Sequence, residues 1–107
     1  MTHDQVVALV TCPVELAERF AETLVEKRLA ACVNIVPRVV SVYRWDGAVE
    51  KADEALMILK TSQSRMDEIE RCLVKIHPNE VFELIALPIT AGAQSYLHWI
   101  ASETQAE

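Results

Sequence analysis

The chain has 107 residues, 51% of them hydrophobic, and a formal net charge of −6. This length suits one domain and not two, and the scattered Lys and Arg residues lack the basic stripe that nucleic-acid binding requires. Every apolar run is shorter than the ~18 residues that span a bilayer, and no basic start precedes an apolar stretch at the N-terminus. We therefore expect a cytoplasmic protein that binds neither nucleic acid nor membrane.

The first third of the chain predicts a strand followed by a helix. The run Val6–Cys12 is short, apolar and rich in β-branched residues, which is typical of a central strand. Pro13 then opens a helix, since proline fits the first helical turn. Leu16, Phe20 and Leu24 recur every four residues among acidic positions, so the helix should bury one face.

A long β-hairpin is predicted next. The segment Cys32–Val36 has β character, and Pro37 should cause a bulge because it cannot donate to a ladder. The strand should resume at Val39 and end at Asp46-Gly47, a dipeptide typical of a type I′ turn. The returning strand, Ala48 to Thr61, contains no Gly or Pro.

This hairpin is too long for the domain that carries it. Fourteen residues of strand at ~3.3 Å each span about 46 Å, whereas a domain of this size is about 34 Å across. In a two-residue loop Trp45 pairs with Ala48 and Tyr43 with Glu50, so Tyr43 and Trp45 share one face of the tip. We expect identical chains to receive the ribbon, with Tyr43 and Trp45 as oligomer contacts; a flexible exposed arm is the alternative.

A second helix follows the hairpin. Ser64 should cap it, with Asp67 three residues later in a capping-box pattern, and Pro78 should end it. Its predicted buried positions, spaced by three and four residues, are Met66, Ile69, Leu73 and Ile76.

The last elements are a fourth strand over Val81–Ile89 and a short helix after Gly92. The apolar anchors of that helix should be Tyr96, Leu97, Trp99 and Ile100. The resulting order, βαββαβ plus a C-terminal helix, predicts a single-domain α+β protein with a ferredoxin-like antiparallel sheet under two helices.

Two residues stand out as candidate metal ligands. His77 ends the second helix, where it could bind copper or zinc, or could instead complement the helix dipole. Glu83 lies inside the predicted fourth strand, where a carboxylate must be paired or ligated; it could bind metal with His77 or form an ion pair, for which Lys60 is a natural partner. We expect His98 on the exposed face of the last helix and His3 in a frayed terminus.

The three cysteines, Cys12, Cys32 and Cys72, are widely spaced and form no CxxC pair. They are interpreted as reduced, mostly buried thiols, without a zinc ribbon or redox motif. No GxSxG, P-loop or GxGxxG motif is present, and the acidic residues of the first helix fit a solvated face. The sequence therefore indicates no catalytic residues and no required cofactor.

Several motifs together resemble one known family. They are "EKRLAACVNI", "YRWDG.VE...E.LMILKT", "HP...FEL" and "LPIT.G...YL.W", which run from Val6 to about Ile100. The chain is similar in them to the CutA divalent-cation-tolerance proteins. This resemblance implies a ferredoxin-like fold, a tight homotrimer, a link to copper and other divalent metals, and an assembly like that of the PII signalling proteins.

The resemblance also adds Cys12 to the candidate metal ligands. In the family, copper binding is linked to a Cys at the end of the first strand. This chain has Val10 at that position, with Cys12 two residues later. Copper binding is also linked to His residues before the Pro, where this chain has Ile76-His77. Asn79 and Phe82 replace the aromatic and the Pro that are usual in the family.

Three classes of function follow. The first is a trimeric, non-enzymatic protein that binds divalent metal, copper above all. The second is a PII-like module holding a small effector between subunits. The third, an RRM-type RNA binder, is disfavoured because the third strand, "EALMILK", has no stacking aromatic.

Overall fold

The computed structural model describes residues 4–106, so His3 lies outside the described residues. The strands are β1 (Gln5–Cys12), β2 (Cys32–Trp45), β3 (Ala48–Ser62) and β4 (Leu84–Pro88). The helices are α1 (Ala17–Glu26), α2 (Met66–Ile76) and α3 (Gln94–Glu103). Short 3₁₀ turns at Val14–Leu16 and Gln63–Arg65 lead into α1 and α2.

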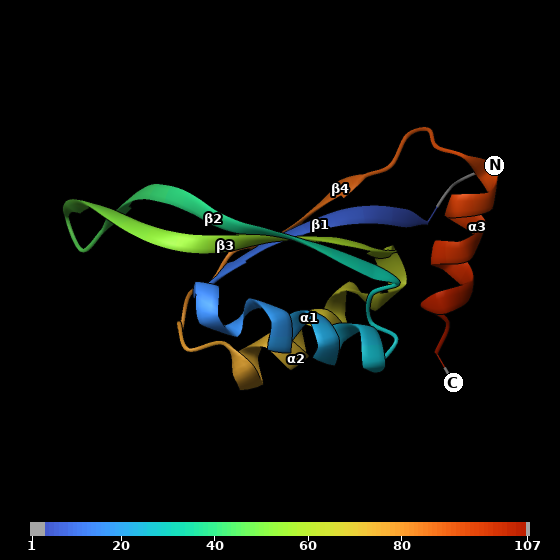
Figure 1. Ribbon diagram of the computed structural model, residues 1–107, viewed down its shortest axis with the longest axis horizontal. Coiled ribbons are helices and arrows are strands. Elements are labelled where there is room, and N and C mark those ends of the chain that lie inside the picture. The colour runs from blue at the N-terminus through green and yellow to red at the C-terminus, as the bar shows by residue number, and fades with distance from the viewer. Residues whose placement is uncertain (1–3, 107) are drawn as a thin grey trace.

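The strands form one antiparallel sheet in the order β2-β3-β1-β4. Figure 1 shows α1 and α2 side by side against one face of this sheet, while α3 stands at its end. This is the α+β, ferredoxin-like arrangement that the sequence predicts. The two crossovers through α1 and α2 place β1 in the middle of the sheet and leave β2 and β4 as its edges.

The core lies between the sheet and the two helices. Alternate side chains of β1 and β3 are buried, as expected for strands with one covered face. The large side chains with less than 2% exposure include Val10, Met57, Leu59, Leu24, Ile69 and Leu73. Truncating one of them, such as Leu73, to alanine costs roughly 2–5 kcal/mol, because a core of this size cannot collapse onto the lost volume.

The hairpin has the predicted register. Trp45 pairs with Ala48 and Tyr43 with Glu50. Asp46 (φ 53°) and Gly47 (φ 82°) both adopt the left-handed conformation of a type I′ turn. The ladder shifts between Val36 and Val39, which confirms the bulge predicted at Pro37. The ribbon extends beyond the helices in Figure 1, and it gives the molecule extents of 45 × 26 × 22 Å.

Two local predictions about helices were wrong. Ser64 does not cap α2: it lies inside a 3₁₀ turn, and α2 has no side-chain cap hydrogen bond. The turn bonds its own backbone, since the N–H of Met66 donates to the carbonyl of Gln63. On α3 only Leu97 and Ile100 are buried, whereas Tyr96 and Trp99 are 42% and 41% exposed.

The fourth strand is shorter than predicted. It spans Leu84–Pro88 instead of Val81–Ile89, so Glu83 lies in the segment before it. The ladder to β1 ends at the pair Val10–Leu84. The preceding residues turn away toward the C-terminal end of α2, where His77 anchors them. The predicted carboxylate inside an apolar strand is therefore an exposed loop carboxylate.

Candidate functional site

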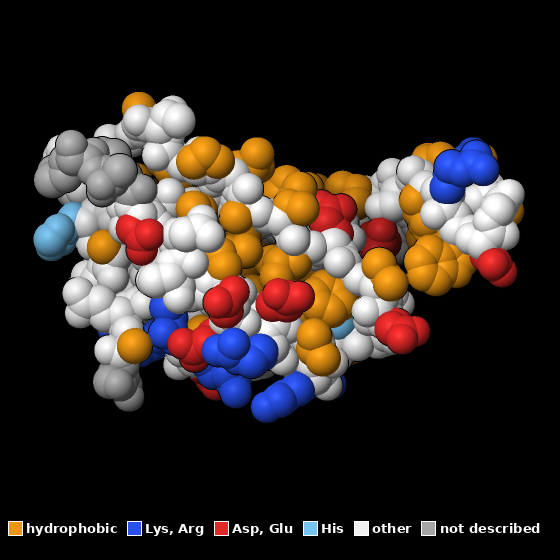
Figure 2. Space-filling view, turned by 180° about the vertical axis from the view of Figure 1, so that it is seen from behind, with side chains coloured by type: hydrophobic (Ala, Val, Ile, Leu, Met, Phe, Trp, Pro, Cys, Tyr) orange, Lys and Arg blue, Asp and Glu red, His pale blue; other side chains and the backbone are white. Residues whose placement is uncertain are grey.

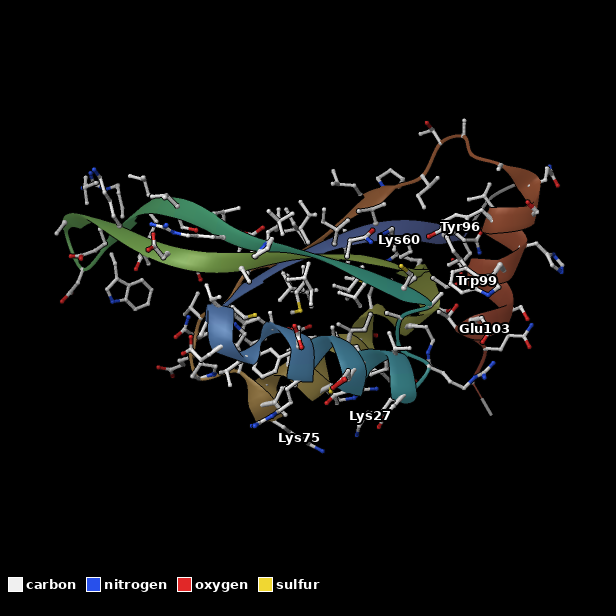
Figure 3. All side chains as sticks on the ribbon, in the orientation of Figure 1. Lys27, Lys60, Lys75, Tyr96, Trp99 and Glu103 are labelled. Atoms are coloured by element: carbon white, nitrogen blue, oxygen red, sulfur yellow. The ribbon has the colours of Figure 1, made fainter. Side chains whose placement is uncertain are left out.

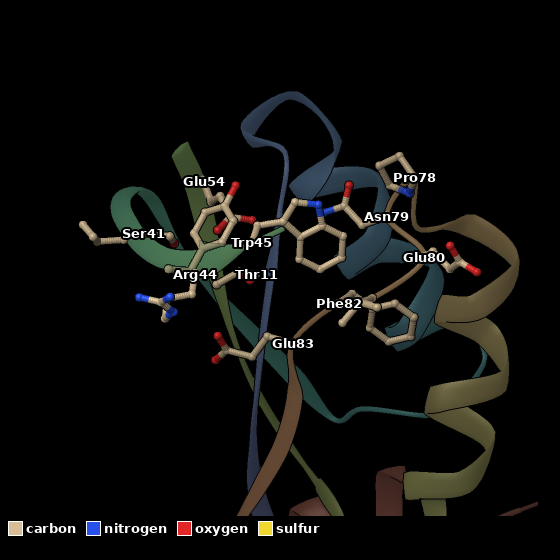
Figure 4. A pocket seen from close by; sticks show the side chains of 13 residues that line it. Thr11, Ser41, Arg44, Trp45, Glu54, Pro78, Asn79, Glu80, Phe82 and Glu83 are labelled. Atoms are coloured by element: carbon tan, nitrogen blue, oxygen red, sulfur yellow. The ribbon is translucent and has the colours of Figure 1, made fainter. Parts of the chain in front are cut away.

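A cleft of ≈ 870 Å³ lies between the hairpin and the segment 78–83. We call it the hairpin cleft. The hairpin contributes Tyr43, Trp45 and Glu54, and the segment 78–83 contributes Phe82 and Glu83. Figure 4 shows the Trp45 indole reaching toward Asn79 and Phe82. The two residues predicted as oligomer contacts thus also line this cleft.

The charge of the hairpin cleft is negative. Its lining includes the carboxylates of Glu54, Glu80 and Glu83, against the single guanidinium of Arg44. Ion pairs among residues 4–106 join Arg38 to Asp53 and Arg65 to Glu68, and neither engages a carboxylate of the cleft. Carboxylates without a paired cation favour a positively charged occupant.

His77 fixes one wall of the cleft. Its Nε2 lies 2.9 Å from the carbonyl oxygen of Thr11, and its Nδ1 accepts a hydrogen bond of 3.1 Å from the backbone N–H of Asn79. Because Nδ1 is an acceptor, Nε2 carries the proton and donates to Thr11. The ring stacks on Phe82, with centroids 5.0 Å apart and planes at 17°. His77 is buried, and both of its nitrogens are engaged.

Cys12 follows the cleft residue Thr11 and is fully buried at the end of β1. Burial raises the pKa of its thiol from 9.0 to about 11, and the nearby carboxylates of Glu54 and Glu15 act in the same direction. The thiol is therefore protonated at neutral pH. A soft metal needs the thiolate, so the environment of Cys12 disfavours metal binding in the single chain.

The predicted partner of Glu83 is engaged elsewhere. The Lys60 ammonium donates to the Asn34 side chain and lies 3.8 Å from the Cys32 sulfur. Burial, and then the charge and hydrogen bond of Cys32, raise the pKa of Tyr96. Figure 3 places Lys60, Tyr96 and Trp99 at the α3 end of the sheet, and the two aromatic rings have centroids 5.5 Å apart.

The three predicted metal ligands are not brought together as one site. No group of three or more His, Cys, Asp or Glu side chains within residues 4–106 could hold a metal ion. His77 has no free nitrogen, Cys12 keeps its proton, and Glu83 is exposed. The residues of one chain therefore do not fit a resident metal, and the ligand roles of His77, Glu83 and Cys12 stay predictions.

Glu54, Glu80 and the cleft itself were missed by sequence reasoning. Tyr43 and Trp45 were correctly placed on one face of the ribbon, but nothing in the sequence says what that face meets. Residues 81–83 were interpreted as the start of a strand, which hid the wall opposite the hairpin. Pro78 and Asn79, both turn-forming residues, were the available signal.

Comparison with known proteins agrees with the fold. A family model described as "CutA1 divalent ion tolerance protein" matches residues 6–103. The chain belongs to this family. The mouse "Protein CutA" is 46% identical to it over 99 residues, which cover 92% of this chain and 56% of the mouse protein. The chain thus spans little more than half the length of this CutA relative.

Solved CutA structures have the same fold. The divalent cation tolerance protein (Cut A1) from Thermus thermophilus superposes with a TM-score of 0.92 at 42% identity, covering 94% of this chain and 99% of the other. A "PII-like protein CutA" from Nostoc sp. PCC 7120, in apo form, gives a TM-score of 0.87 at 30% identity, over 94% and 97% of the two chains. The names of these CutA proteins refer to cation tolerance or to likeness with PII, and to no reaction.

Within residues 4–106, no helix has the length and apolar character needed to cross a bilayer.

Proposed function

We propose that this CutA-family chain acts in divalent-cation tolerance as a homotrimer that binds cations and catalyses no reaction. The observation that carries the assembly is the uncovered face of its sheet, opposite α1 and α2. The side chains of this open face are Val7, Leu9, Leu56, Ile58, Ile85 and Leu87. Ile85 and Leu87 are 51% and 49% exposed in the single chain.

An apolar sheet face of this kind needs a cover, and a closed ring of identical chains is an economical one. Figure 2 shows hydrophobic side chains gathered along the middle of the molecule and onward toward the hairpin. β2 and β4 are edge strands with unpaired backbone groups on their outer sides. The hairpin, with Tyr43 and Trp45 at its tip, would then lie against a sister chain.

Light scattering after gel filtration tests the assembly. The expected result is a mass three times that of the chain, kept upon dilution to low micromolar concentration. A monomeric mass, with Tyr43 and Trp45 accessible to solvent, would reject the trimer and every site that depends on it.

The cation part of the proposal is supported by the charge of the hairpin cleft and by the family's name. Because one chain gathers no ligand set, we propose that copper or another divalent ion is held by groups from more than one subunit. Calorimetric titration with Cu(II) tests this. The variant Glu83→Gln should weaken binding, while Glu22→Gln, on the exposed face of α1, should not. Affinity weaker than millimolar, or equal in the two variants, would remove Glu83 as a ligand.

A second candidate is a PII-like module that binds a small effector in the cytoplasm. Two observations favour it. The hairpin cleft has a volume of ≈ 870 Å³, which is within the range of small-molecule sites. A structural neighbour is itself described as PII-like. Thermal-shift screening against nucleotides, organic anions and organic amines would test it, and a response to metals alone would count against it.

A further inference from the structure

We propose that a groove beside α2 docks a basic peptide segment of another protein. An apolar side chain of that segment would fill the groove, and its Lys or Arg residues would meet the acidic rim. The groove has a volume of ≈ 410 Å³ and runs between α2 and the segment 80–84. We call it the α2 groove. Neither the cation-binding nor the effector-binding form of the proposed function uses this surface of α2.

The floor of the α2 groove is apolar. Val74 of α2 and Val81 of the opposite wall are 64% and 67% exposed, and both line the groove. Within residues 4–106, Val81 is the most exposed large hydrophobic side chain. Met66, Phe82 and Leu84 complete the apolar lining. Exposed apolar side chains that share one hollow are typical of a contact surface, unlike those that are scattered singly.

The rim of the groove carries negative charge on both sides. Asp67 and Glu70 lie on α2, and Glu80 lies on the opposite wall. Figure 4 shows the Glu80 carboxylate directed away from Trp45, so it is not committed to the hairpin side. Neither ion pair among residues 4–106 involves these three acids, and none of the described lining residues is Lys or Arg. A positively charged partner therefore has the complementary charge.

The assembly proposed for this chain uses other surfaces. It covers the open face of the sheet, which lies opposite α1 and α2, whereas the α2 groove is on the helix side. Leu84, which lines the groove, packs against the core between the sheet and the helices. Neither Tyr43 nor Trp45 is among the lining residues. A homotrimer would therefore present one α2 groove per subunit on its outer surface, and a partner with repeated basic segments would bind with avidity.

A peptide suits this geometry better than a metal ion or an anion. A metal needs several ligands that converge on one point, and no such group exists among residues 4–106. An anion would meet the three carboxylates of the rim. The occupant must be apolar in its middle and positive on either side, because the acids of the rim flank an apolar floor. A peptide with an apolar side chain between Lys or Arg residues has this distribution.

Both walls of the α2 groove are fixed by the fold. On one side, Ile69 and Leu73 are fully buried and hold α2 against the core. On the other side, Phe82 is stacked on the buried His77 ring. A rigid groove loses little conformational entropy when it binds, so a short peptide can be held without rearrangement of the protein.

Fluorescence anisotropy of a labelled peptide tests the binding with the whole chain in its native assembly. The probe is a fluorescein-labelled amphipathic peptide of leucine and lysine. Its anisotropy should rise in a saturable way as the protein is added, and the affinity should fall with added salt. Two control peptides, one with glutamate for every lysine and one with serine for every leucine, should bind far more weakly.

Matched substitutions locate the binding site. Glu70→Lys should weaken binding of the leucine–lysine peptide by roughly threefold to tenfold, and Val74→Lys by roughly tenfold, because each places a cation in the groove. Glu22→Lys and Val25→Lys make the same changes on exposed α1 and should bind the peptide nearly as the parent does. Equal masses by light scattering and equal circular dichroism spectra would show that the variants keep their assembly and fold.

Hydrogen exchange gives a readout that does not depend on any substitution. The bound peptide should slow amide exchange in residues 80–83 and leave exchange at the tip of the hairpin unchanged. Protection of the tip instead would place the peptide in the hairpin cleft and overturn the inference.

Other results would also overturn it. They are equal affinities for the three peptides, equal losses in Glu70→Lys and Glu22→Lys, and no binding at millimolar protein. A reduced mass of Val74→Lys would show that the groove is an interface between copies of this chain, which excludes docking of another protein there. The proposed function is read separately, from the mass of the parent chain and from its Cu(II) and small-molecule titrations.

Discussion

The imidazole of His77 joins two distant parts of the chain through both of its nitrogens. It holds the end of β1, at Thr11, against the turn at Asn79. We expect His77→Ala to lower the free energy of unfolding by roughly 1–3 kcal/mol, because a partly buried carbonyl and a backbone N–H lose their partners and Phe82 loses its stacked ring. Urea unfolding measures this. His98→Ala, on the exposed side of α3, should change stability by less than about 0.5 kcal/mol. Equal effects of the two substitutions would contradict this structural role.

Because of Cys12, the free energy of unfolding should fall as the pH becomes alkaline. Its pKa is raised from 9.0 to about 11 in the folded chain, because burial penalises the thiolate. The stabilisation is therefore fully present below the unfolded pKa and is lost as the pH rises through the folded pKa. Two pKa units correspond to a total of roughly 3 kcal/mol at most. Urea unfolding at pH 8 and at pH 11 should show a larger loss for the parent than for Cys12→Ala. The same pH slope in both chains would disprove this assignment.

At the scale of single residues, the sequence predicts whether a side chain is buried, exposed or paired better than it predicts what the side chain does. The burial of Cys12, the exposure of His98 and the pairing of Trp45 could all be inferred from local pattern. The use of His77 could not, since a histidine before a proline at a helix end fits a metal ligand and a packed hydrogen-bonding ring equally well. The choice depends on Thr11 and Phe82, which only the fold brings to it. Glu83 was wrongly placed inside a strand, because β4 begins at Leu84, the residue after it.

Among the elements, the hairpin turn is determined most locally. Gly47 has φ +82°, and nothing lies within 4 Å of a Cβ added there. Gly47→Ala should therefore destabilise the hairpin by about 1 kcal/mol through backbone strain alone. Faster amide hydrogen exchange near the tip would report it. Asp46→Asn should be nearly neutral because asparagine tolerates the left-handed conformation. Unchanged exchange in Gly47→Ala would mean that the turn does not limit the hairpin.

Element boundaries show where local pattern stops being sufficient. The order of strands and helices, the bulge at Pro37 and the hairpin register follow from spacing and turn chemistry. The start of β4 cannot be inferred in this way, because the apolar residues of "VFELIALPI" continue across the point where the chain leaves the ladder. That point is set by the tertiary contact of Phe82 with His77. The hairpin cleft exists because of the same early departure.

For the molecule as a whole, the open face of the sheet is where assembly can be broken without unfolding the chain. Leu87 is half exposed on β4, so a charged side chain there should cost a single chain little. We expect Leu87→Lys to convert the proposed trimer to a monomer, because the buried interface would then hold unpaired ammonium groups. Light scattering measures the mass. Val74→Lys, on exposed α2, is the matched control, and a trimeric Leu87→Lys would place the interface elsewhere.

The strand order has a further consequence, for synthesis on the ribosome. β1 emerges first, yet its two neighbours in the sheet are β3 and β4, which are made much later. Until residue 88 has left the exit tunnel, one side of this apolar strand has no partner. A sheet that depends on such late, long-range pairing folds slowly, and the unpaired apolar edge of β1 stays exposed in the meantime. Nascent chains that stall before β4 should therefore aggregate or recruit chaperones, whereas those released after it can complete the sheet.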